Sequence, residues 1–184
     1  MTVPNLITIL RLVIIPFFLM AMVYGHYRVG VWLFIGSGVS DALDGAIARV
    51  FDQRSKLGAF LDPMADKLMM TTVYITLALP NIGLPYPLPV WLPILTICRD
   101  VVIVLLALLL HLQVGITKFP PTWAGKCTTF FQIVFASAAL VQNAYWLPEL
   151  FVDALLWLVV FFTVYSGLHY LWRTRQLVSS ASEA

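Results

Sequence analysis

Four aspartates stand close together in a polar stretch that apolar sequence flanks on both sides: Asp41, Asp44, Asp62 and Asp66. The sequence predicts two helices here. On the first, with about 100° of rotation per residue, an arc of roughly 140° includes five residues: Asp41, Asp44, Gly45, Ala48 and Arg49. A narrow stripe on the second helix, with spacing i, i+4, i+8, holds Gly58, Asp62 and Asp66. A short charged turn joins the helices, so the sequence predicts an antiparallel pair whose acidic faces meet.

Carboxylates at this density repel one another, and partial burial favours their protonation. A divalent cation, or a pair of them, removes both costs, and oxygen ligands suit magnesium, calcium or manganese rather than zinc or copper. Gly45 and Gly58 leave room beside the acids for a ligand to approach the backbone. The alternative is that the acids are solvated helix ends, salt-bridged in part to Arg49, Arg54 and Lys56. Acids on a membrane helix are costly and usually functional, which favours metal binding.

The spacing of these residues resembles a known signature. The pattern Asp-x2-Asp-Gly-x2-Ala-Arg-x8-Gly-x3-Asp-x3-Asp, which begins at Asp41, matches that of the CDP-alcohol phosphotransferase family at every fixed position. Residues 4–11, with the sequence PNLITILR, are similar to the opening helix of the family's bacterial phosphatidylglycerophosphate synthases. The resemblance implies an enzyme that transfers the phosphoalcohol part of a CDP-alcohol, here CDP-diacylglycerol, to a second alcohol and releases CMP.

The resemblance also implies roles for the motif residues. Asp41, Asp44 and Asp62 would be the principal metal ligands, and Asp66 would complete the site and act as the catalytic base. The pocket for the CDP group would be formed by Asp41, Asp44, Gly45, Ala48, Arg49 and Gly58. Two Mg²⁺ or Mn²⁺ ions would clamp the diphosphate and stabilise charge on the leaving phosphate.

Two basic residues inside later apolar segments, Arg99 and Lys126, are candidates for binding an anionic acceptor. Arg99 and its neighbour Asp100 are expected to point in different directions and to need separate partners. The resemblance favours glycerol-3-phosphate as the acceptor, which would make this a phosphatidylglycerophosphate synthase. However, the Arg99-Asp100 pair and residues 121–126 are more like the related cardiolipin synthases, whose acceptor is phosphatidylglycerol. That alternative stays open.

Composition predicts the elements that position these residues. A chain of 184 residues that is 61% hydrophobic and 11% charged, with a mean hydropathy of +0.91, is typical of an integral membrane protein. Six apolar segments, roughly 5–24, 30–51, 57–79, 89–112, 122–143 and 147–172, are each near the ~20 residues that span a bilayer. We therefore expect one all-α domain over residues 1–184, a bundle of six transmembrane helices, with a disordered tail at about 176–184. Gly36, Gly38 and Gly125 are expected to permit close helix packing.

Charges outside the acidic motif predict orientation and contacts. One set of loops and flanks is basic, through Arg49, Arg54, Lys56, Lys118, Arg173 and Arg175, whereas the other side holds only Arg28, Glu149 and Asp153. Both termini and the acidic cluster are therefore expected on the cytoplasmic side, in a bacterial inner membrane. A snorkelling or interhelical salt-bridge role is expected for Arg11, whereas Lys67 and Asp100 either have such a role or belong to the site. The net charge of +2 gives no argument for nucleic acid, and a homodimer is left open.

Two other classes of protein share some of these features. A divalent-cation transporter also places acids in a membrane, but its acids would mark a path across the bilayer, whereas the four aspartates lie near one face. An intramembrane prenyltransferase rich in aspartate also binds a diphosphate, but the fixed spacing with Gly45 and Arg49 fits it poorly. The sequence therefore favours a phosphatidyltransferase.

Overall fold

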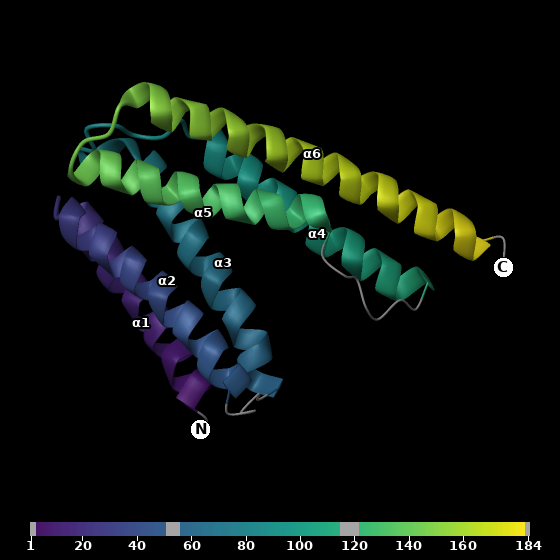
Figure 1. The fold of residues 1–184 in the computed structure, drawn as a ribbon. Coiled ribbons are helices and arrows are strands. Elements are labelled where there is room, and N and C mark those ends of the chain that lie inside the picture. Colours follow the sequence, from purple (N-terminus) through teal and green to yellow (C-terminus); the bar gives the residue numbers. More distant parts are fainter. Residues whose placement is uncertain (1–2, 51–55, 115–121, 183–184) are drawn as a thin grey trace. The chain divides into compact units, whose positions relative to one another are not determined.

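The computed structural model describes the backbone of residues 3–50, 56–114 and 122–182, and the side chains of residues 8–41, 61–110, 112 and 122–176. This part of the chain is helical and contains no strand (Figure 1). Its elements are α1 (Val3–Val23), α2 (Tyr27–Val50), α3 (Lys56–Ala78), the short 3-10 helix η1 (Pro80–Ile82), α4 (Trp91–Val114), α5 (Trp123–Ala144) and α6 (Glu149–Ser182). The predicted all-α class is confirmed, and each α-helix overlaps the apolar segment predicted for it. The α6 helix extends through Ser182, into the tail for which the sequence predicts disorder.

Three helices in the described part of the chain are long and apolar enough to cross a membrane. The qualifying stretches are Trp91–Leu110, Trp123–Ala144 and Glu149–Gln176, in α4, α5 and α6. The α1 helix holds a shorter apolar stretch, Thr8–Val23. Acids and bases of the motif interrupt the apolar character of α2 and α3. Membrane spans are thus supported for three of the six predicted segments.

Contacts divide the chain into two compact units, each of which is described by itself. The first unit consists of Met1–Val90 and Ala136–Pro148. Within it, α1 packs against both α2 and α3. The core of this unit consists of buried apolar side chains that include Phe18, Met22, Val31, Val73 and Leu77. The α1 helix is therefore the element that α2 and α3, the two carriers of the acidic motif, have in common.

Glycine brings α1 and α2 together at one position. A Cβ atom added to Gly30 would lie 2.5 Å from Sδ of Met22 on α1, so a side chain there would displace the core methionine. Added Cβ atoms at Gly36 and Gly38 meet no described atom within 4 Å. Among the described atoms, the close helix packing predicted at Gly36 and Gly38 is therefore not found. It occurs instead at Gly30, nearer the start of α2.

The second unit consists of Trp91–Phe135 and Glu149–Ala184, and in it α4 packs against α6. The α5 helix is joined to α6 by ring stacking, since the centroids of Phe131 and Phe162 are 4.6 Å apart at an interplanar angle of 11°. The hydroxyl of Thr128 also donates to the carbonyl of Phe162 at 2.9 Å. Large apolar side chains such as Trp157 and Leu168 are exposed on this unit, as a lipid-facing surface requires.

Candidate active site

Three aspartates of the motif meet two polar residues on α1. The guanidinium of Arg11 donates from Nη2 to Oδ1 of Asp41 at 2.7 Å and from Nη1 to Oδ1 of Asp66 at 2.5 Å. Thr8 lies one turn earlier on the same helix, and its hydroxyl donates to Oδ1 of Asp62. Two residues spaced i, i+3 share one face of a helix. One face of α1 therefore gathers three of the four motif acids from α2 and α3.

The side chain of Arg11 is buried, whereas those of Asp41 and Asp66 are partly exposed. The side chain of Arg11 is only 1% exposed, whereas those of Asp41 and Asp66 are 44% and 52% exposed. A buried cation is costly unless it is paired and hydrogen-bonded, and the two carboxylates supply that pairing. Asp41 and Asp66 thus lie at the boundary between the packed helices and the exposed surface of this unit.

The donor atoms of this cluster suit a hard divalent cation. Its ligating groups are all oxygen, and the guanidinium of Arg11 shows that carboxylates from α2 and α3 can converge on one positive group. Within the described residues, no group of three or more acidic, histidine or cysteine side chains lies close enough to form a complete metal site. The side chains of the other predicted motif residues lie outside the described part of the chain: Asp44, Gly45, Ala48, Arg49 and Gly58.

The sequence alone does not place Thr8 and Arg11 in the site. The interhelical salt bridge expected for Arg11 is confirmed, but its partners are 30 and 55 residues away in sequence. Only the packing of α1 on α2 and α3 brings these groups together. The available signals were a charge inside an apolar helix and the similarity of residues 4–11 to the family's opening helix.

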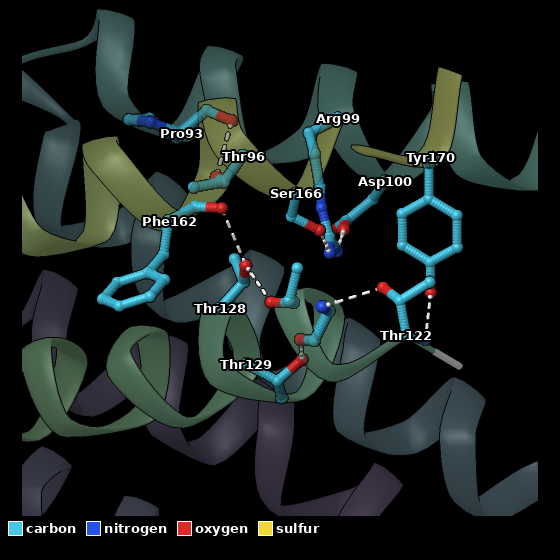
Figure 2. A network of polar contacts seen from close by, with 12 residues as sticks. Pro93, Thr96, Arg99, Asp100, Thr122, Thr128, Thr129, Phe162, Ser166 and Tyr170 are labelled. Carbon is cyan, nitrogen blue, oxygen red and sulfur yellow. Dashed lines mark hydrogen bonds and ion pairs between the residues drawn. The ribbon is translucent and has the colours of Figure 1, made fainter. Parts of the chain in front are cut away.

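Arg99 belongs to a polar network in the second unit (Figure 2). Its Nη1 donates to Oδ1 of Asp100 at 3.0 Å, and its Nη2 donates to Oγ of Ser166 on α6 at 2.5 Å. The guanidinium carbon also lies 5.9 Å from the ring centroid of Tyr170. The prediction that Arg99 and Asp100 need separate partners is therefore wrong. The long arginine stem lets the guanidinium return to its neighbour even though the two Cβ atoms diverge.

The start of α5 is held by Tyr170 of α6. The backbone N–H of Thr122 donates to the Tyr170 hydroxyl at 3.0 Å, and the N–H of Gly125 donates to Oγ1 of Thr122 at 3.1 Å, as at a helix N-cap (Figure 2). A Cβ added to Gly125 would lie 3.1 Å from the Tyr170 hydroxyl, so the predicted close packing at this glycine is confirmed. Lys126 follows with an exposed side chain, and its role beside Arg99 stays a prediction.

Removal of the Tyr170 hydroxyl should destabilise the second unit. Tyr170→Phe leaves the buried N–H of Thr122 without its acceptor, at a cost of about 1–3 kcal/mol. We expect the melting temperature of the detergent-solubilised protein to fall by several degrees. Tyr165→Phe is the matched control, because Tyr165 lies on the same helix and is 50% exposed. Equal melting temperatures for the two variants would contradict this role of Tyr170.

Comparison with known proteins matches most of this chain to one protein family. The family model for CDP-alcohol phosphatidyltransferase matches residues 1–165, a range that includes the whole acidic motif, Arg99 and Lys126. The CDP-diacylglycerol–glycerol-3-phosphate 3-phosphatidyltransferase of Bacillus subtilis is 34% identical over 187 residues, which cover 91% of this chain and 92% of that protein.

Relatives described as cardiolipin synthases also match. A protein of Mycobacterium tuberculosis described as a candidate cardiolipin synthase is 38% identical over 144 residues, covering 77% of this chain and 66% of that protein. The CMP-forming cardiolipin synthase of Homo sapiens is 26% identical over 197 residues, covering 96% of this chain and 64% of that protein. The chain thus spans just under two thirds of the length of these two relatives.

Proposed function

This chain belongs to the CDP-alcohol phosphatidyltransferase family, and we propose that it transfers a phosphatidyl group from CDP-diacylglycerol to an alcohol with release of CMP. The observation that carries the proposal is the gathering of Asp41, Asp62 and Asp66 on one face of α1. These acids occupy the positions of the family signature, and the side chains of Asp41 and Asp66 are about half exposed. The name of the Bacillus relative supplies the donor class.

In the proposed site, Asp41, Asp44, Asp62 and Asp66 would hold one or two Mg²⁺ or Mn²⁺ ions. Such an ion, when bound, would neutralise the diphosphate and the charge that develops on the leaving CMP. Arg49 would bind a donor phosphate, and the residues that leave room for the CDP group would be Gly45, Ala48 and Gly58. Most of the rate enhancement in phosphoryl transfer comes from such positioning and electrostatic stabilisation.

The proposed reaction is a single displacement at the phosphorus that carries the diacylglycerol. The acceptor hydroxyl oxygen forms a new bond to this phosphorus, and the bond from the phosphorus to the bridging oxygen breaks. CMP leaves with the electron pair, and the proton of the hydroxyl passes to the carboxylate of Asp66. A carboxylate that accepts this proton acts as a general base.

Glycerol-3-phosphate is the acceptor that we propose first. It is named in the Bacillus relative, whose match covers nearly the whole of both chains. Phosphatidylglycerol is the second candidate, since the mycobacterial relative named as a candidate cardiolipin synthase is 38% identical. The purified protein, given CDP-diacylglycerol and Mg²⁺, should release CMP and form phosphatidylglycerophosphate with glycerol-3-phosphate, and should release no CMP with phosphatidylglycerol. Cardiolipin as the lipid product, identified by its mass, would overturn this choice of acceptor.

Arg99 and Lys126 are proposed to bind the phosphate of the acceptor. One charge-assisted contact contributes roughly 1.5–3 kcal/mol, so Arg99→Ala should raise the KM for the acceptor by about tenfold or more. The KM for CDP-diacylglycerol should stay near its original value. Because Arg99 also pairs with Asp100, Lys126→Ala is the companion variant, since the Lys126 side chain is exposed and its loss disturbs little packing. An unchanged acceptor KM in both variants would remove these residues from the site.

We further propose that residues 1–184 form a single membrane domain, in which α1, α2 and α3 cross the bilayer as well as α4, α5 and α6. The excess of basic residues around the acidic motif supports a cytoplasmic active site in a bacterial inner membrane. CDP-diacylglycerol would then enter from the bilayer and the soluble acceptor from the cytoplasm. A homodimer is compatible with this arrangement and is testable by the mass of the detergent-solubilised protein.

A further inference from the structure

We propose that Thr8 and Arg11 of α1 are positioning residues, which orient the carboxylates of the acidic motif for metal and nucleotide binding. The inference rests on the proposed function and extends it to a helix that the acidic signature does not include. It assigns a role to two residues of the opening stretch 4–11 that the sequence singles out.

The contacts of α1 hold each acid by one oxygen. Arg11 bonds Oδ1 of Asp41 and Oδ1 of Asp66, and Thr8 bonds Oδ1 of Asp62. In the described part of the chain, no hydrogen bond to Oδ2 of any of these acids is found. Around metal sites, neighbouring groups typically fix one oxygen of a ligating carboxylate by a hydrogen bond, while its other oxygen is available to the metal ion.

The geometry requires an arginine at residue 11. Its two Nη atoms contact carboxylates on two different helices, at 2.7 Å to Asp41 and 2.5 Å to Asp66. A lysine has the same charge but presents one compact ammonium group, so it cannot reproduce the planar fork. Arg11 therefore sets the separation of the two carboxylates and also offsets part of their negative charge.

Burial indicates that these contacts serve the site. Thr8 and Arg11 are 0% and 1% exposed, in a helix whose neighbouring core residues are apolar. Buried ion pairs are often no more stabilising than apolar residues of similar volume, because desolvation offsets the attraction. An arginine buried beneath acids that stay about half exposed is thus poorly explained by stability alone.

The test uses two substitutions that leave the net charge unchanged, Thr8→Val and Arg11→Lys, in the full chain in detergent. The first measurement is the rise in melting temperature on adding Mg²⁺ and CDP, as a function of Mg²⁺ concentration. We expect the half-saturating Mg²⁺ concentration to increase by about 10- to 100-fold in each variant, the usual effect of losing a group that orients a metal ligand. Thr8→Ser, which restores the hydroxyl donor, should bring it back towards the original value.

Arg28→Lys is the matched control in the same unit. Arg28 lies on α2, where it contacts the Ala144 carbonyl at 3.4 Å and the ring of Tyr145 at 5.3 Å. Its position, 13 residues before Asp41, is about 20 Å away along the helix. We expect this variant to keep the original Mg²⁺ dependence.

Two results would overturn the inference. One is a lower melting temperature for Thr8→Val and Arg11→Lys with an unchanged half-saturating Mg²⁺ concentration, which would show a purely structural role. The other is the absence of any Mg²⁺-dependent stabilisation in the unmodified protein. The proposed reaction fails separately, if the unmodified protein binds Mg²⁺ and CDP but releases no CMP with any acceptor.

Discussion

Asp66→Asn should lower the turnover number by about 10²–10⁴-fold, the usual contribution of a positioned general base. The amide cannot take the proton of the acceptor hydroxyl, but it keeps the shape of the carboxylate. We expect binding of CDP-diacylglycerol to be largely retained, because Asp41, Asp44 and Asp62 are the principal metal ligands that we propose. The measurement is turnover at saturating substrate, with donor binding followed separately by calorimetry.

Two further variants serve as controls for this result. Asp153→Asn changes an exposed acid on α6 and should leave turnover unchanged. Asp41→Asn should weaken donor binding, because Asp41 is proposed as a metal ligand. If Asp66→Asn loses donor binding to the same extent as Asp41→Asn, Asp66 is mainly a ligand and another group takes the proton.

Removal of divalent metal should abolish CMP release. Stabilisation of the transferring group by a metal contributes several kcal/mol, so a chelator should lower the rate by roughly a thousandfold or more. Excess Mg²⁺ or Mn²⁺ should restore the rate. The control is the same chelator already saturated with Mg²⁺, which should have no effect. Full activity in the metal-free protein would rule out the proposed role of the aspartates.

Sequence alone predicts the parts of this fold that depend on local pattern. Long apolar runs predict the α-helices to within a few residues at most ends, and the fixed spacing of the acids places Asp41 and Asp62 on two adjacent helices. Local pattern also identifies Arg11 as a charge that needs a partner inside an apolar helix. These inferences hold because helix periodicity and the cost of a buried charge act over a few residues.

Contacts between distant residues could not be predicted in the same way. Which acids pair with Arg11 depends on how α1 packs on α2 and α3, and the close approach at Gly30 depends on the position of Met22 in that packing. The pairing of Arg99 with Asp100 depends on side-chain torsion angles that sequence spacing does not determine. The sequence therefore indicates the acidic cluster but not the α1 residues that hold it.

The most direct test of the central claim measures CMP release from CDP-diacylglycerol by the purified full chain, with Mg²⁺ and with or without an acceptor. We predict acceptor-dependent release, with one phospholipid product formed for each CMP, and no uptake of divalent metal by proteoliposomes that contain the protein. Metal uptake by the proteoliposomes, with no CMP released from CDP-diacylglycerol in the presence of either glycerol-3-phosphate or phosphatidylglycerol, would contradict the account and indicate a transporter.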